Sequence, residues 1–157
     1  MAARVLVLMQ DPSSVAAHGS RLISRHNNDQ TAHNLMRVAE AAGLGYESSV
    51  HWNVVPWWVT DPAIPPGERI GLRRAAQRAR PHLAELLALL PDLTVVVLLG
   101  RPAQESWTAS GLRPAGVDVI TAPHPSPQAF HALDRQTGRR NGDLVLDALT
   151  RAATAVR

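Results

Sequence analysis

The heptapeptide Leu93-Thr94-Val95-Val96-Val97-Leu98-Leu99 restricts the fold of this chain more than any other segment. It has the length of a strand, is rich in β-branched residues and lacks the alternation of a strand with one wet face. A nearly unbroken apolar run of this kind is typical of a parallel strand buried on both faces. The segment therefore predicts a parallel sheet that is covered by helices on both sides.

The rest of the chain alternates between strand-like and helix-like segments. Three further apolar runs have strand length: Val5–Met9, Val50–Val55 and Val117–Ala122. Four segments have helical patterns: from an N-cap at Asp29 to Ala42, within Gly67–Leu90 with a break at Pro81 left open, from Pro102 to Ser110 with Gly111 as its stop, and Asp143–Val156. This alternation implies βαβ crossovers. We expect an α/β fold, a three-layer α/β/α sandwich with a central four-stranded, mostly parallel sheet.

Length and composition exclude several classes of protein. The 157 residues suit one domain over residues 1–157, with enough chain for a real core. The absence of cysteine excludes disulfides, a thiol nucleophile and a cysteine-ligated cluster. All 16 basic residues are arginine, so a Schiff base formed through a lysine amine is excluded as well.

The charge of the chain favours a polyanionic partner. The net charge is +3 and the pI is near 10.9, with arginines in clusters. An alternative that stays open is that the arginine usage reflects a GC-rich genome. We find no signal peptide and no apolar segment of membrane length, so we expect a cytoplasmic protein with no membrane partner.

Two short polar loops follow the first and the last of the strand-like runs. They are Gln10-Asp11-Pro12 and His124-Pro125-Ser126-Pro127. Open α/β sheets place their chemistry at the carboxyl ends of their strands, and proline stiffens such loops. A carboxylate and an imidazole held in this way are the usual groups of acid–base or electrostatic catalysis. We therefore interpret Asp11 and His124 as candidate catalytic residues.

Three motifs, in order along most of the chain, resemble those of the uracil-DNA glycosylase superfamily. Gln10-Asp11-Pro12 is similar to the family's Gly-Gln-Asp-Pro motif, with Met9 in place of the glycine. Trp52-Asn53-Val54-Val55 resembles its strand-end asparagine motif, and the second loop matches its His-Pro-Ser-Pro motif in full. The resemblance is to a cluster-free member, because some branches hold an iron–sulfur cluster on four cysteines that this chain lacks.

The resemblance implies a function. It implies a uracil-DNA glycosylase-like fold and a monofunctional DNA glycosylase that flips uracil or a related damaged base out of DNA and hydrolyses its N-glycosidic bond. Such an enzyme would act in base excision repair, on DNA, without a cofactor, and we expect it to be a monomer.

Within this resemblance, three residues have defined roles. Asp11 would orient the attacking water and stabilise the positive charge that develops on the deoxyribose. His124 would stabilise the anion that develops on O2 of the departing uracil. Asn53 would read the O4/N3 edge of the base, because its amide offers both a donor and an acceptor. Each residue also has a structural interpretation, as an Asp-Pro turn, a surface histidine and a strand cap.

Further residues complete the expected base pocket. Gln10 accompanies Asp11 in the first motif, and Ser13 occupies the place of a tyrosine that crowds C5 of the base in the strictest uracil-specific branch. Ser13 thus leaves room for C5-substituted uracils. The family's stacking phenylalanine is missing, and Ile23, its neighbour Leu22 or else His26 is nearest to that place.

We expect the DNA contacts to lie in and after the His-Pro-Ser-Pro loop. Ser126 is a candidate phosphate contact, and Gln128 holds the position of the family's leucine wedge, with Phe130 as the alternative wedge. Arg139 and Arg140, preceded by Arg135, would contact phosphates, although a solvated charge run is the alternative. For the polar segment His26–Asp29 with His33 we expect no metal, because its spacing matches no zinc pattern.

Two other functions stay open at this point. One is a binding module of the same fold that recognises damaged DNA without cleaving it. The other is a nucleoside hydrolase or deoxyribosyltransferase that uses the same acid–base pair on free nucleosides. Activity on free deoxyuridine, compared with activity on a uracil-containing oligonucleotide, separates the alternatives.

Overall fold

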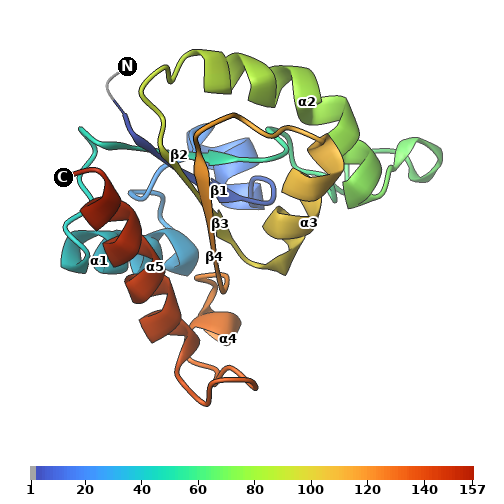
Figure 1. Cartoon of the computed structure of the whole chain (residues 1–157). Helices are drawn as coiled ribbons and strands as arrows, with labels where there is room; N and C mark the ends of the chain where they lie inside the picture. Colours follow the sequence, from blue (N-terminus) through green and yellow to red (C-terminus); the bar gives the residue numbers. More distant parts are fainter. Residues whose placement is uncertain (1–2) are drawn as a thin grey trace.

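A single four-stranded sheet forms the centre of the molecule in the computed structural model, which describes residues 3–157. The strands β1 (Val5–Met9), β2 (Ser49–Asn53), β3 (Val95–Leu99) and β4 (Asp118–Ala122) lie in the order β2-β1-β3-β4 (Figure 1). Every neighbouring pair is parallel, which sharpens the expected mostly parallel sheet to a fully parallel one. The carboxyl ends of all four strands therefore lie along the same edge.

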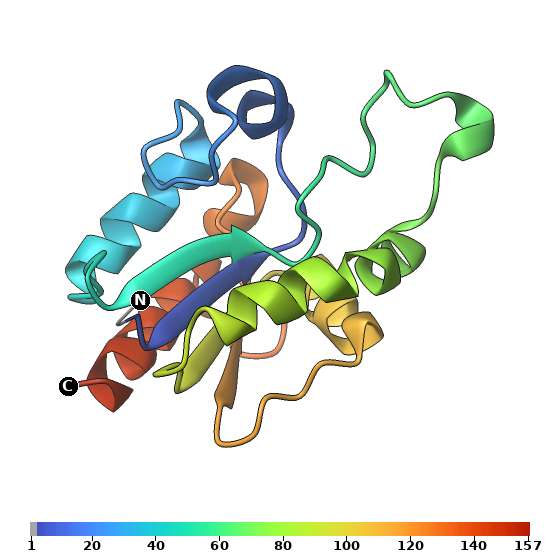
Figure 2. The ribbon, with the colours of Figure 1, turned by 90° about the horizontal axis from the view of Figure 1, so that it is seen from above.

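Helices cover both faces of the sheet, which confirms the three-layer α/β/α architecture. On one face lie α1 (Gln30–Ala41) and α5 (Asn141–Ala155), and on the other lie α2 (Leu72–Ala88) and α3 (Arg101–Ser110) (Figures 1 and 2). Three short helical segments occur in the connections: a π-helical turn η1 (Val15–Ser20), a 3₁₀ turn η2 (Pro66–Glu68) and α4 (Pro127–Phe130).

The side chains of the central strands divide between two apolar cores. In β1, Val5 and Val7 pack with α1 and α5, whereas Leu6 and Leu8 pack with α2 and α3. All five residues of β3 are buried, as the Leu93–Leu99 run predicts. Burying each such side chain contributes about 1.5–3 kcal/mol to the free energy of unfolding. The two central strands, β1 and β3, therefore give the site at their carboxyl ends a stable base.

The ends of several elements follow local chemistry. The Asp29 carboxylate accepts the Ala32 amide at 2.9 Å and caps α1 as expected, and Gly111 ends α3 in a left-handed conformation. The α2 helix begins at Leu72 and runs through Pro81 without a break. Proline has no N–H, so the carbonyl of Gln77, four residues earlier, loses its helical hydrogen bond. Because Pro81 and Gln77 are both exposed, this carbonyl is on the solvent side of the helix.

A long connection between β2 and α2 leaves the body of the molecule. Figure 2 shows this segment, residues 56–71, as an arm that projects beyond the carboxyl edge of the sheet. We refer to it below as the arm. Its outer part, including Pro62 and Pro65, is largely exposed, as expected for a proline-rich surface loop. Within residues 3–157, no helix combines the length and apolar character needed to cross a membrane.

Candidate active site

A cavity of about 320 Å³ opens at the carboxyl edge of the sheet. It lies between the ends of β1, β2 and β4, the first turns of α1 and the polar connection that contains η1. The six residues that the sequence indicates as catalytic or base-binding all line it: Gln10, Asp11, Ser13, Ile23, Asn53 and His124. Residues from four separate segments of the chain thus meet in one place, where an open α/β sheet places its ligands.

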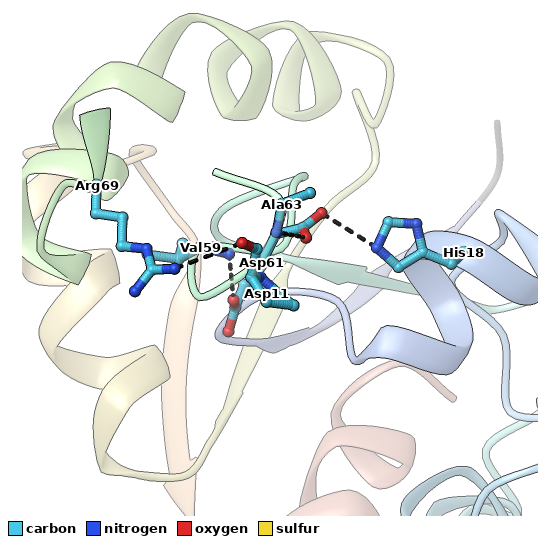
Figure 3. Close-up of polar contacts among 7 residues, drawn as sticks. Asp11, His18, Val59, Asp61, Ala63 and Arg69 are labelled. Carbon is cyan, nitrogen blue, oxygen red and sulfur yellow. Dashed lines mark hydrogen bonds and ion pairs between the residues drawn. The ribbon is translucent and has the colours of Figure 1, made fainter. Parts of the chain in front are cut away.

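Asp11 is held by the arm. Its Oδ2 accepts the backbone N–H of Val59 at 2.8 Å, which Figure 3 shows beside the contacts within the arm. Burial raises the pKa of Asp11 above its ordinary value of 3.8, while the bonds from Val59 and Gln10 lower it in part. The Val59 bond favours the carboxylate form and fixes one of its oxygens.

His124 presents a defined ring nitrogen. Its Nδ1 accepts the backbone N–H of Ser126 at 3.1 Å, a bond that requires an unprotonated Nδ1. Burial lowers the pKa of His124 below its ordinary value of 6.5, so the ring is neutral near pH 7. The proton of this neutral ring therefore lies on Nε2. The side chain can act as a hydrogen-bond donor toward a developing anion.

Two neighbours fix the His-Pro-Ser-Pro loop. The buried side chain of Asn34 on α1 donates from Nδ2 to the Pro125 carbonyl at 2.9 Å. Gly100, with φ of +89°, ends β3 directly under the imidazole, where an added Cβ would lie 2.9 Å from the Cβ of His124. A larger residue at this position would displace the ring, and its backbone conformation also favours glycine.

Asn53 offers an acceptor with no partner of its own. The side chain is 2% exposed at the end of β2, and its Oδ1 makes no hydrogen bond to any residue from 3 to 157. A buried acceptor of this kind costs free energy unless a ligand satisfies it. An N–H at the edge of a bound base would do so.

Two residues that the sequence analysis did not select also line the cavity, namely Arg25 and His51. Arg25 is 3% exposed; its Nη1 donates to the Leu44 carbonyl at 3.0 Å and its guanidinium lies 3.8 Å above the Tyr46 ring. Burial, together with the charge of Arg25, lowers the pKa of His51 to about 3. The period-2 alternation of a strand places His51 on the same face as Asn53, a signal that could have identified it. For Arg25 the sequence gives only its place in a polar connection.

The candidates for base stacking lie in different surroundings. Ile23 lines the cavity, whereas Leu22 is exposed and does not. His26 stacks on Tyr46 at a ring-centroid distance of 5.5 Å. Trp58 also lines the cavity, while Trp57 packs against the core under α2. Ile23 thus remains the apolar stacking candidate that lines the cavity, and Trp58 is an aromatic side chain that lines it as well.

The five residues expected to contact DNA lie outside the cavity. Ser126 precedes α4 and is half-buried, and Gln128 is exposed on that helix. Phe130 packs against the core, where Gly142 of α5 leaves room for its ring. Arg139 and Arg140 are exposed, and Arg139 forms an ion pair with Asp147 at 2.7 Å. Contacts of these residues with DNA remain predictions, and Phe130 sits where a packing role accounts for it.

A second contact joins the arm to the rest of the site. The Asp61 carboxylate, in the arm, lies 3.1 Å from Nε2 of His18 on η1 and also accepts the Ala63 amide at 2.8 Å (Figure 3). On the far side of the arm, Arg69 donates from Nε to the Ile64 carbonyl at 3.0 Å. These bonds shape the loop that carries Val59. Within the part of the chain that the structure describes, no cluster of three or more His, Cys, Asp or Glu side chains is placed to hold a metal ion.

Comparisons with known proteins identify the family and the fold of the chain. The model of the uracil DNA glycosylase superfamily matches residues 1–146, so the chain belongs to that superfamily. A solved structure of wild-type SMUG2 from Pedobacter heparinus is similar, with 13% sequence identity and a TM-score of 0.62. The match covers 98% of this chain and 76% of the SMUG2 chain, and at this identity it shows the fold. No curated protein sequence matches the chain.

Proposed function

We propose that this protein is a monofunctional DNA glycosylase that excises uracil or a related damaged base from DNA. The observation that carries the proposal is the meeting of Asp11 and His124 in one cavity at the carboxyl edge of the sheet. Breaking an N-glycosidic bond builds positive charge on the sugar and negative charge on the base. A carboxylate and a neutral imidazole donor stabilise the two ends of this separating charge.

The reaction follows from the state of each group. A base flipped into the cavity places its O2 near Nε2 of His124, which donates to the oxygen as the bond lengthens. Asp11 orients a water molecule toward the sugar carbon and stabilises the cationic transition state. The water adds to that carbon, its proton passes to the carboxylate, and the base leaves with the electrons of the broken bond. The product is DNA with an abasic site.

The proposal is tested with labelled oligonucleotides. We expect hot alkali to break a uracil-containing strand after incubation with the protein and to leave a thymine-containing control intact. Asp11→Asn should lower the rate by roughly two to four orders of magnitude with little change in DNA binding. Ser14→Ala, in the same connection but not in the catalytic pair, is the matched control.

The same experiment distinguishes the other two functions. Binding of uracil DNA without any cleavage would favour a damage-binding module, and faster hydrolysis of free deoxyuridine than of the oligonucleotide would favour a nucleoside hydrolase. A monofunctional enzyme without lysine should also form no covalent adduct with DNA when borohydride is present during turnover. A trapped adduct at a residue other than the N-terminal amine would contradict the hydrolytic mechanism.

A further inference from the structure

A buried cation with free donors lies at the β2 side of the cavity. Arg25 is 3% exposed, and among residues 3–157 it has no ion-pair partner. One of its nitrogens, Nη1, is bound to the Leu44 carbonyl, but the buried Nε and Nη2 have no hydrogen-bond partner in that part of the chain. Buried donors on a charged group are costly when they are left unsatisfied. Two such donor nitrogens beside a cavity point to an acceptor on a ligand.

The side chain is held in place for such a contact. The Leu44 carbonyl fixes one end of the guanidinium, and the Tyr46 ring stacks on its face. His51, which is buried beside it, is neutral because its pKa is lowered to about 3, so it supplies no counter-charge. The planar guanidinium thus has a fixed orientation, and its free edge carries only donors.

Three polar groups from separate segments of the chain line the same cavity. His124 follows β4 at one end, and Asn53 ends β2 at the other. Arg25 lines the cavity beside β2: it contacts Leu44 and Tyr46, which precede that strand, and its charge acts on His51 within it. Together the three groups offer the cavity two donors and one acceptor. This set is the complement of an imide, whose edge carries two carbonyls with an N–H between them.

We propose that Arg25 is a specificity-determining residue that donates to the second carbonyl of the base, C4=O of uracil, while Asn53 Oδ1 accepts its N3–H. The inference rests on the proposed function and deepens it by naming the recognised group. An asparagine amide can turn over and pair with cytosine, which has an acceptor at N3 and an amino group at C4. Arginine has no acceptor in any orientation, so it rejects the amino group in every rotamer.

The test compares two substrates in two proteins. The substrates are oligonucleotides with uracil or with 4-thiouracil, whose sulfur is a poor acceptor, and the proteins are wild type and Arg25→Met. For each protein, kcat/KM for uracil is divided by kcat/KM for 4-thiouracil. We expect this ratio to be roughly tenfold to a hundredfold higher in wild type than in Arg25→Met, because the variant lacks the hydrogen bond from a charged donor. Comparing this ratio between the two proteins cancels the difference in intrinsic reactivity of the two bases.

Two controls separate recognition from a general structural effect. In 2-thiouracil, sulfur replaces the oxygen that faces His124. The ratio of kcat/KM for uracil to that for 2-thiouracil should therefore be the same in Arg25→Met as in wild type. Arg37→Met, at an exposed position on α1, should keep both ratios. A residue with only a structural role would slow all substrates equally, so an unchanged uracil to 4-thiouracil ratio in Arg25→Met would overturn the inference.

Binding of the free bases makes the test independent of turnover. We expect wild type to bind uracil more tightly than 4-thiouracil in calorimetry or NMR titration, and Arg25→Met to bind the two bases equally. If no oligonucleotide is cleaved but this difference in binding persists, the proposed function fails and the role of Arg25 stands. If cleavage occurs and the variant keeps the wild-type preference, the role of Arg25 fails and the proposed function stands. Wild type that binds neither base would overturn the inference.

Discussion

Asp11 is subject to two opposing influences at the scale of a single side chain. Burial raises its pKa above 3.8, and the amide of Val59 stabilises the carboxylate that the proposed reaction needs. The balance is a carboxylate whose protonation occurs at a higher pH than that of an exposed aspartate. In the proposed mechanism, the active form is lost as the pH falls and this carboxylate takes up a proton.

We predict that the rate of uracil excision falls on the acid side, at a pH above 3.8. Asp11→Asn should have a lower rate and should lack this decline, because its amide does not titrate. Single-turnover rates measured from about pH 4 to about pH 8 check both statements. An equal acid decline in the variant would assign it to protonation of His124 instead.

His51 makes a separate contribution to stability. Its pKa is about 3 in the folded protein and 6.5 in the unfolded chain, so between these values the unfolded chain binds more protons. The free energy of unfolding should therefore decrease as the pH falls below 6.5, by roughly 2–3 kcal/mol near pH 4.5 from this residue alone.

Urea unfolding of wild type and His51→Phe at pH 7 and near pH 4.5 measures this effect. The variant should lose less stability between the two conditions, whatever its stability at pH 7. A decrease of the same size in both proteins would show that His51 does not titrate in this way, and His33→Phe, on the exposed side of α1, is the control.

Between elements, α1 is linked to the His-Pro-Ser-Pro loop by a buried hydrogen bond. Asn34 crosses this boundary from a buried position and holds the Pro125 carbonyl next to His124. We predict that Asn34→Ala lowers the free energy of unfolding by roughly 1–3 kcal/mol and lowers kcat by more than tenfold, because the imidazole loses its fixed orientation.

Thermal unfolding and single-turnover kinetics test this prediction together. Gln30→Ala is the matched control, because Gln30 is exposed and donates to Oδ1 of Asn34, whereas Asn34 itself donates to the loop. The control should retain most of its stability and activity. Full activity in Asn34→Ala would show that other contacts, such as the packing on Gly100, suffice to position His124.

Local sequence patterns predict part of the helices and strands correctly. The Val5–Met9 run forms a strand with the same bounds, and Asp29 caps its helix, because apolar runs and side-chain caps depend on short-range chemistry. The positions of Asp11, Asn53 and His124 in one cavity also follow from strand ends and motifs. The continuity of α2 through Pro81 could not be predicted, because it depends on which side of the helix faces solvent.

The contacts of Arg25 and Asn34 could not be predicted from sequence patterns for a related reason. Arg25 contacts the segment that leads into β2, and Asn34 contacts Pro125 across a long stretch of chain. Neither residue belongs to a periodic pattern or a motif that would predict its partner. Long-range polar contacts of this kind are visible only once the layers are assembled.

Across the whole molecule, the site is divided between the two ends of the chain. Asp11 and Asn53 precede the arm, and His124 follows it. The two parts meet in the middle of the sheet, where β1 pairs with β2 on one side and with β3 on the other. The arm that connects them packs on the core through Val59 and Trp57, whereas its outer residues are exposed.

We therefore predict that cleavage in the exposed outer part of the arm yields two fragments that complement each other. A protease recognition sequence inserted near Gly67 should allow cleavage without loss of uracil excision, because the β1–β3 ladder and both apolar cores still join the pieces. Val59, which holds Asp11, stays with the first piece. The nicked protein should then have a melting temperature that rises with its concentration, as in a heterodimer. Pieces that elute together without activity would show that chain continuity through the arm is needed to align Asp11 with His124.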